Sequence, residues 1–295
     1  RDLVRSRGLG DVYKRQSLSP SEIVAPSFII QLSLLKDANS RDLLARVEST
    51  SKPLSCFARV STGLKAYQTG KGKPRQTDKH KENRLFHAKR KLNHTYGRYL
   101  DGVDVSRYHL GWSGEWLSYG DWLAEPRRSV AFDGERILVR QIPGSPPYLI
   151  HAVITTERFY HDINSMVVFD PVGDIPLKFI LGVVNSRLLS TWFQKKYDKL
   201  QRKIFPQFKV KELAAFPICS IDLSHPSDDV AHHRMISLVD SMLALHKQLA
   251  AAKSEAQKEV LQRQIDATDH EIDRLVYDLY GLTEEEIAIV EGEER

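Results

Sequence analysis

Side chains that can form two hydrogen bonds at once occur at several points in the middle of this chain. Arginine pairs in this way with guanine, and asparagine and glutamine pair with adenine, so such residues could read the base edges of DNA. The same groups also bond to the backbone in folded proteins, so each of them could be structural instead. The candidates are Arg127, Arg128, Arg140, Gln141 and Asn164.

Two stretches of the sequence are rich in lysine and arginine. Residues 65–98 contain eleven of them against Asp78 and Glu82, and residues 195–211 contain seven against Asp198. Cationic side chains that meet phosphates release counterions, which produces an affinity for nucleic acid that falls steeply with salt. Either run alone could be ordinary solvated surface. Two runs that flank a segment rich in Tyr and Trp favour a nucleic-acid partner.

We expect both basic runs to fold onto a single face that holds a DNA duplex, while the acidic end of the chain, residues 264–295, faces away from it. Phosphate contacts would position the duplex, and base contacts would specify its sequence. The candidates for contact with DNA outside the base-reading set are Lys71, Lys73, Arg75, Tyr119, Lys195, Lys196, Lys199, Arg202 and Lys203.

The signatures of a complete catalyst are missing from the sequence. It has no Gly-x4-Gly-Lys-Ser/Thr nucleotide-binding loop, no Gly-x-Ser-x-Gly nucleophile turn and no His-Glu-x-x-His pair. It also lacks the Asn/Asp-Pro-Pro-aromatic tetrapeptide of amino-group DNA methyltransferases and the carboxylate-and-lysine cluster of restriction nucleases. We therefore expect no catalytic residue and no metal site in this chain.

The bulk composition is that of a globular protein. The 295 residues are 41% hydrophobic, enough for a real core, and the formal net charge is +5. Only Cys56 and Cys219 are cysteines, which excludes a disulfide framework and a four-cysteine zinc site. No apolar run approaches the roughly 20 residues that cross a membrane. We expect a cytoplasmic protein without a membrane partner.

The hydrophobic pattern predicts a β-rich middle. Residues 136–142 alternate as a strand does, and residues 148–155 and 165–169 are further expected strands. Residues 177–193 have helical spacing, and so do residues 40–47.

The pattern becomes helical again from about residue 229. Two heptad-like seams, separated by weak turn signals, predict an antiparallel hairpin of helices, although one long helix would also fit. Gly281 is expected to end the second helix, and Thr283 with Glu286 has the spacing of a capping box.

Several segments, taken in their order along the chain, resemble a known family. They are residues 99–108 (YLDGVDVSRY), 117–127 (LSYGDWLAEPR), 136–142 (RILVRQI), 177–188 (LKFILGVVNSRL), 216–218 (FPI) and 272–283 (IDRLVYDLYGLT). The resemblance is to the TaqI-like C-terminal specificity domain of adenine-specific DNA methyltransferases, type IIG restriction-modification enzymes and BREX-type methylases. It extends over residues 56–290.

The resemblance implies a target recognition domain that docks in the major groove of double-stranded DNA, opposite a methyltransferase domain. The methyl donor S-adenosylmethionine and the catalytic tetrapeptide would belong to that upstream domain of the same polypeptide. The chain itself would bind no cofactor.

The expected fold class is α+β, with a mixed, β-rich target recognition domain followed by a C-terminal α-helical hairpin. Residues 1–16 resemble translated sequencing-adapter sequence and are expected to be non-native, and residues 17–55 would connect to a missing upstream methyltransferase domain. Residues 56–220 would form the recognition domain, 228–282 the hairpin, and 283–295 a short acidic helix or tail.

The sequence thus predicts a sequence-specific DNA recognition module of an adenine-N6 DNA methyltransferase or a type IIG restriction-modification enzyme, without the catalytic domain. One alternative is a specificity and scaffold subunit of a multi-chain restriction-modification system, although such subunits typically carry two recognition domains. A second alternative is a self-contained nuclease, which the missing carboxylate-and-lysine cluster disfavours. Whether the parent enzyme also cleaves DNA stays open.

Overall fold

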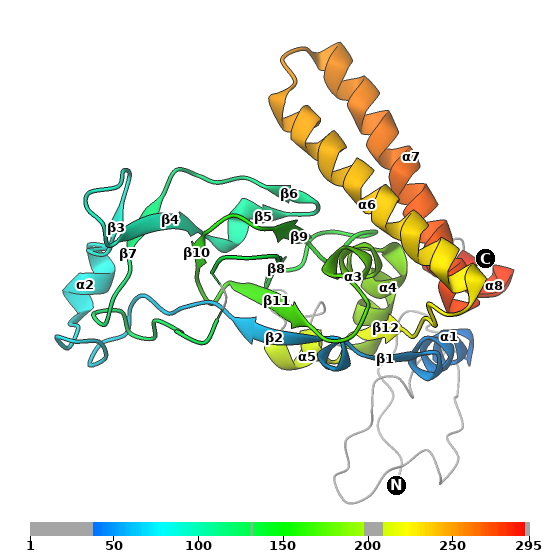
Figure 1. The fold of residues 1–295 in the computed structure, drawn as a ribbon, viewed down its shortest axis with the longest axis horizontal. Coiled ribbons are helices and arrows are strands. Elements are labelled where there is room, and N and C mark those ends of the chain that lie inside the picture. Colours follow the sequence, from blue (N-terminus) through cyan, green and yellow to red (C-terminus); the bar gives the residue numbers. More distant parts are fainter. Residues whose placement is uncertain (1–37, 131, 198–208, 293–295) are drawn as a thin grey trace, which may run out of the picture.

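A four-stranded antiparallel sheet stands at the centre of the computed structural model, which describes residues 38–130, 132–197 and 209–292. The strand order is β2-β11-β8-β9 (Figure 1). The strands are β2 (Ala58–Thr62), β8 (Arg136–Arg140), β9 (Ala152–Thr155) and β11 (Ser165–Pro171). The three strands expected between residues 136 and 169 are all present.

Both faces of this central sheet are covered. Side chains alternate along a strand, so Leu138 and Val167 point into one core while Ile137 and Met166 point into another. The first core lies against a second sheet, and the other lies against the helices. Burial on both faces is the reason why these strands are apolar at almost every position.

The second sheet lies toward one end of the long axis, with the order β10-β4-β7-β3. Its strands are β3 (His87–Ala88), β4 (Tyr96–Leu100), β7 (Trp116–Ser118) and β10 (Tyr160–His161). Strand β10 runs parallel to β4 and pairs Tyr160 with Tyr99. Short elements complete this end: α2 (Asp78–Glu82), a 3-10 turn η4 (Gly102–Asp104), and the paired strands β5 (Val105–Ser106) and β6 (His109–Leu110).

The helical stretch expected over residues 177–193 is two helices rather than one. Helix α3 (Leu177–Val184) ends at Asn185, and α4 (Arg187–Lys196) begins after Ser186, whose hydroxyl accepts a bond from the Leu189 amide. The amide of Asn185 bonds to both the N–H and the C=O of Ala152 in β9, at 3.1 and 2.9 Å. These bonds to β9 fix the position at which the helix is interrupted. The hydrophobic periodicity of residues 177–193 does not indicate them.

The C-terminal part forms the expected hairpin. Helix α6 (Pro226–Ala251) and helix α7 (Glu255–Tyr280) pack along each other, and their connected ends project beyond the body (Figure 1). Gly281 ends α7 in the left-handed conformation, φ 62°, which glycine adopts without a side-chain clash. Thr283 and Glu286 form the predicted capping box of α8 (Glu284–Glu291). The fold class is α+β, as expected.

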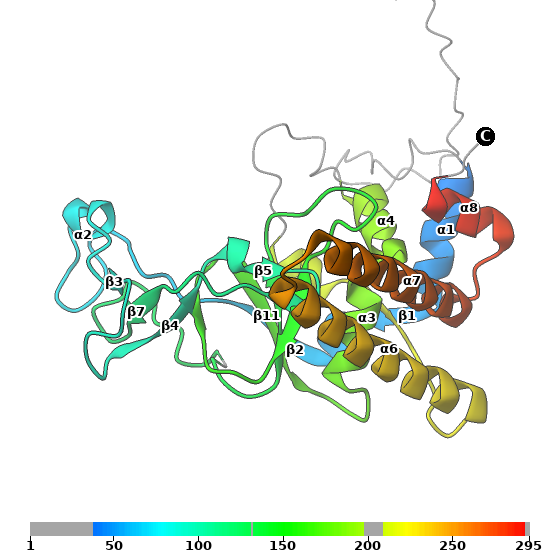
Figure 2. The same ribbon diagram turned by 90° about the horizontal axis from the view of Figure 1, so that it is seen from above.

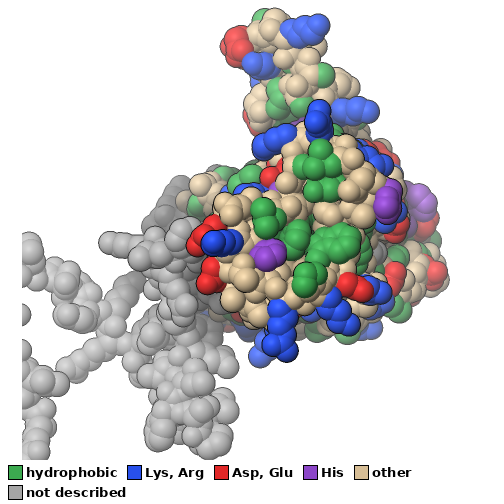
Figure 3. Space-filling model, turned by 90° about the vertical axis from the view of Figure 1, so that its left-hand side faces the viewer, with side chains coloured by type: hydrophobic (Ala, Val, Ile, Leu, Met, Phe, Trp, Pro, Cys, Tyr) green, Lys and Arg blue, Asp and Glu red, His purple; other side chains and the backbone are tan. Residues whose placement is uncertain are grey.

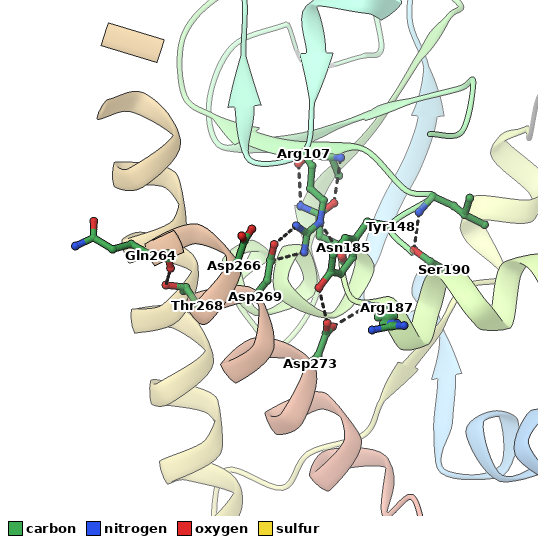
Figure 4. A network of polar contacts seen from close by, with 12 residues as sticks. Arg107, Tyr148, Asn185, Arg187, Ser190, Gln264, Asp266, Thr268, Asp269 and Asp273 are labelled. Carbon is green, nitrogen blue, oxygen red and sulfur yellow. Dashed lines mark hydrogen bonds and ion pairs between the residues drawn. The ribbon is translucent and has the colours of Figure 1, made fainter. Parts of the chain in front are cut away.

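A polar cluster joins the hairpin to the β-rich part (Figure 4). Arg107, which follows β5, donates two hydrogen bonds to Asp269 of α7, at 2.5 and 2.6 Å. The guanidinium also lies 3.7 Å from the ring centre of Tyr148, whose hydroxyl donates to Asp273, 2.7 Å away. Burial raises the pKa of Asp273 to about 6. This cluster, with both partners of the ion pair nearly buried, attaches α7 to the sheet region.

The stretch expected as a connector packs into the main core. Helix α1 (Ala38–Ser49) buries Leu43 and Val47, and Arg46 donates to Glu286 of α8 at 2.7 Å. The remaining elements beside it are β1 (Ser51–Pro53), which pairs with β12 (Pro217–Cys219), the 3-10 turn η3 (Leu54–Cys56) and α5 (Val210–Ala214). Among the described residues, no helix has the length and apolar character needed to cross a membrane. Residues 1–16 lie outside the described part.

Candidate nucleic-acid interface

A loop at the β-rich end presents the first group of predicted phosphate contacts. Lys71, Lys73 and Arg75 are exposed, and none of them has an ion pair within the described ranges. The loop is held by Gln76, which is 3% exposed and donates to the carbonyls of Ala66 and Trp122, at 2.9 and 2.7 Å. A buried amide thus holds the base of the loop and leaves its cations in solvent.

The tight approach of this loop to Trp122 depends on a glycine. Gly72 has φ +82°, and a Cβ atom at this position would lie 2.3 Å from the carbonyl oxygen of Trp122. Both the left-handed backbone and the missing side chain are therefore required here.

A second loop, residues 119–128, lies against the first. The Lys73 amide donates to the carbonyl of Asp121 at 2.8 Å. The ring of Tyr119 stacks on Tyr160 with centres 4.5 Å apart, and its hydroxyl donates to the Pro126 carbonyl. Tyr119 therefore positions this loop from a half-buried site.

Both predicted arginines of the second loop are exposed but paired. Arg127 contacts Glu125 at 2.6 Å, and Arg128 forms an ion pair with Asp121. Exposed pairs of this kind contribute about 1 kcal/mol or less, so a phosphate could replace the carboxylate at small cost.

A polar pocket of about 360 Å³ opens beside the basic loop. Asp101 and Asp162 lie side by side in it, because they directly follow the paired parallel strands β4 and β10. Asn164 donates to Asp162 through its backbone and its side chain, at 2.8 and 2.6 Å. Lys81, Arg84, His87 and Tyr99 are further residues of the wall. We call this site the Asp101–Asp162 pocket.

Burial sets the electrostatics of the pocket. It raises the pKa of Asp162 to about 6, an effect to which the neighbouring charge of Asp101 adds. Burial, reinforced by Arg84, lowers the pKa of His87 to about 4, so this imidazole is neutral near pH 7. Arg84 itself is bound by both carboxylate oxygens of Glu115 at 2.8 Å. At neutral pH the pocket thus offers a carboxylate acceptor, Asp162, in a lining that includes the exposed Lys81.

The outer face of this end combines apolar and cationic side chains. Figure 3 shows apolar groups across the middle of the face, with Lys and Arg side chains at several places around its edge. Leu85 and Leu92 are both more than half exposed and belong to the same basic stretch of the chain.

Two further predicted base readers lie at the end of β8, next to the pocket. Gln141 is only 7% exposed, and its backbone N–H donates to the backbone carbonyl of Asn164 at 2.9 Å. Arg140 is half-buried beside His151, where its charge helps to lower the pKa of that imidazole below its ordinary value. The structure thus brings Arg140, Gln141 and Asn164 together, with the Gln141 side chain covered.

The expectation that both basic runs share one face is wrong for the part of the second run that is described. Lys195 donates to Ser40 at 2.8 Å, and Lys196 pairs with Glu48 at 2.8 Å, both residues of α1. This contact lies toward the opposite end of the molecule from α2 (Figures 1 and 2). The physical reason is that α4 packs on α1 through the buried apolar residues of α4. Lys199, Arg202 and Lys203 lie outside the described residues.

Comparison with known families identifies the segment that supplies Asp101, Asp162 and Asn164 to the pocket. Residues 97–218 match the sequence model of the TaqI-like C-terminal specificity domain. This segment is therefore similar in sequence to TaqI-like specificity domains. Asp101, Asp162, Arg140 and Asn164 lie inside it, whereas the loop with Lys71, Lys73 and Arg75 precedes it.

The similarity of this chain to a solved structure extends beyond residues 97–218. The type IIL restriction-modification enzyme MmeI, solved in complex with DNA, matches with a TM-score of 0.50 and 11% sequence identity. The match covers 82% of this chain and 36% of MmeI, so the chain spans little more than a third of that protein. This likeness establishes a shared fold. A comparison with curated proteins found no match.

The sequence analysis missed three residues that shape the candidate interface. These are Gln76, Asp101 and Asp162, whose roles depend on burial and on the pairing of β4 with β10 rather than on local sequence pattern. A usable signal was present for the two acids: Tyr-Leu-Asp at 99–101 and Tyr-His-Asp at 160–162 are similar strand endings of the TaqI-like domain.

Proposed function

We propose that this chain is the DNA target recognition part of a restriction-modification protein, and that the parent is an adenine-N6 DNA methyltransferase or a type IIG enzyme. The observation that carries the proposal is the TaqI-like specificity domain at residues 97–218. The fold shared with MmeI, which was solved with DNA, supports it.

Double-stranded DNA would be held at the β-rich end. Lys71, Lys73 and Arg75 would contact phosphates, because their charged groups are in solvent and unpaired within the described residues. Arg127 and Arg128 would exchange their exposed carboxylate partners for phosphates. These contacts would position the duplex without reading its sequence.

Base reading would fall to the groups around the Asp101–Asp162 pocket. A carboxylate accepts a hydrogen bond from the exocyclic amino group of cytosine, and asparagine pairs with adenine. Asp162 and Asn164 supply these two groups from one side of the pocket, and Arg140 supplies a guanine partner nearby. Such contacts discriminate between bases by about 1–3 kcal/mol each.

The remaining functions of the parent would lie in another domain of the same polypeptide. That domain would bind S-adenosylmethionine and carry the catalytic tetrapeptide, and the projecting hairpin α6–α7 would brace it. The TaqI-like domain would hold the duplex while the target adenine is flipped out of the stack. We place the protein in the cytoplasm.

The phosphate contacts are tested by a triple substitution, Lys71→Ala with Lys73→Ala and Arg75→Ala. We expect weaker binding to every duplex, because a sequence-independent term is removed. The slope of log affinity against log salt should fall by about 2.7, from three contacts at about 0.9 each. Fluorescence anisotropy with random-sequence duplexes at several salt concentrations measures it.

The matched control is Lys247→Ala with Lys253→Ala and Arg263→Ala, three exposed cations of the hairpin region. Both variants lose three positive charges, so a general effect of net charge would appear in both. Equal slopes for the two variants would refute a DNA site at the β-rich end.

Sequence reading is tested separately with Arg140→Ala. Duplexes selected by the wild-type protein from a random pool define its target. The variant should select a target that is degenerate at one base pair and otherwise the same. If the two proteins select identical targets, Arg140 does not read a base.

A further inference from the structure

Three potential metal ligands share one face near the beginning of the hairpin. Asp229, His232 and His233 of α6 are spaced i, i+3 and i+4, which brings such positions together on a helix. One ligand atom from each lies within 4.8 Å of the other two. This is the sole group of three His, Cys, Asp or Glu residues with that property in the parts of the chain that the structure describes.

His232 supplies an independent indication of a ligand. Its side chain is 7% exposed, and both ring nitrogens are buried without a hydrogen-bond partner among the described residues. The ring lies tilted against Phe179 of α3, with ring centres 5.7 Å apart. An unsatisfied buried polar group is costly and calls for an explanation, of which a bound ion is one.

The same condition at another histidine has no such explanation. His161 is also buried with both ring nitrogens unpartnered, yet it belongs to no group of three candidate ligands in the described ranges. His232 is therefore a candidate ligand because Asp229 and His233 lie beside it, and not because of its burial alone.

His233 already contacts Asp229, another residue of the group. Its Nδ1 lies 2.9 Å from the backbone carbonyl of Asp229 and 3.3 Å from the Asp229 carboxylate. Metal-bound histidines characteristically donate their second ring N–H to a carbonyl or carboxylate, which fixes the ring. The carboxylates of Asp228 and Asp229 offset the partial positive charge of the helix N-terminus, which would otherwise oppose a cation.

We propose that Asp229, His232 and His233 bind one divalent transition-metal ion of the zinc class. Two imidazole nitrogens and one carboxylate oxygen suit zinc, cobalt or nickel rather than magnesium or calcium. Water would complete the coordination on the exposed side. The ion would hold the first turns of α6 in place beside α3, where Met235 already packs against Gly182. The proposal is independent of DNA binding.

The site is tested by titrating the untagged, metal-free protein with Co²⁺ and Zn²⁺. We expect one equivalent of Co²⁺ to bind, with visible absorption bands of a nitrogen- and oxygen-coordinated ion, and Zn²⁺ to displace it. Zinc at about 100 times its dissociation constant should raise the melting temperature by about 5 °C or more. Absence of saturable binding would overturn the proposal.

Two substitutions at exposed ligands separate this site from nonspecific binding. Asp229→Asn and His233→Ala should each weaken cobalt affinity at least tenfold and abolish the zinc-dependent rise in melting temperature. His270→Ala, which removes an exposed histidine of α7, is the matched control and should change neither. Unchanged affinity in both ligand variants, with circular dichroism confirming that they fold, would place the ion elsewhere. His232 is left intact because its replacement would disturb the packing against Phe179.

Discussion

The cations of the 71–75 loop at the β-rich end differ from several basic side chains near α4 and α7 in whether a carboxylate pairs with them. At the helical end, Arg107 is held by Asp269 and Arg187 by Glu291, and Lys196 contacts Glu48. At the β-rich end, the loop with Lys71 and Lys73 points its cations into solvent. A run of positive charge therefore does not by itself indicate a ligand-binding surface, because folding decides which of its members are paired.

Breaking the buried pair at the helical end should have the largest effect on stability. Asp269→Ala leaves Arg107 as an uncompensated charge at a site where the two side chains are 11% and 8% exposed. We expect the free energy of unfolding to fall by about 3–5 kcal/mol. Urea denaturation measures this change.

The matched control for that pair is Glu271→Ala, on the same helix. Glu271 contacts Arg234 at 3.3 Å, but these side chains are 53% and 60% exposed. Solvent screens such a pair, so the loss should be about 0.5 kcal/mol or less. Similar losses of unfolding free energy for Asp269→Ala and Glu271→Ala would show that burial does not make the Arg107–Asp269 pair more important for stability than the exposed pair.

The pocket at the β-rich end should give a smaller, pH-dependent effect. Burial raises the pKa of Asp162 to about 6, so the folded protein holds this proton more tightly than the unfolded chain does. The resulting stabilisation is complete below about pH 4 and is lost as pH rises through 6, by about 3 kcal/mol.

The measurement is the unfolding free energy from pH 4 to pH 7 for the wild type and for Asp162→Asn. The wild type should lose stability relative to the variant over this range. Asp133→Asn, at an exposed position before β8, should follow the wild type. Parallel curves for the wild type and Asp162→Asn would contradict the raised pKa.

The smallest effect is expected from the second basic run. Lys195→Ala with Lys196→Ala would lower the salt slope of DNA binding by about 1.8 if both residues met phosphates. Because these side chains are tied to Ser40 and Glu48, we expect a change below about half that value, and less than about threefold in affinity. A decrease of the salt slope by the full amount of about 1.8 would show that Lys195 and Lys196 contact phosphates.

Local patterns predicted those elements whose cause lies within a few residues. The alternation at 136–142 is strand β8, Gly281 ends α7, and Thr283 with Glu286 caps α8. The break between α3 and α4 was not predicted, because its cause is the bonding of Asn185 to a strand more than thirty residues away.

Only part of the candidate interface was predicted, again because local patterns do not show contacts between remote residues. The cationic loop at 71–75 could be found from composition, and its neighbours Arg127, Arg128 and Asn164 come to the same end of the fold. The Asp101–Asp162 pocket could not, because it depends on the parallel pairing of two strands sixty residues apart in the chain.

The amino-acid sequence by itself determined the α+β class, the hairpin and the resemblance to TaqI-like specificity domains, since periodicity, caps and motif order are properties of the chain. Only the tertiary structure decided which cations lack an ion pair among the described residues and which carboxylates share a pocket. It also decided that the ring nitrogens of His232 are buried without a hydrogen-bond partner among those residues. Those properties depend on burial and on distances between remote residues, and charge acts through its surroundings: a carboxylate 3 Å away or a layer of solvent changes what the same lysine can bind.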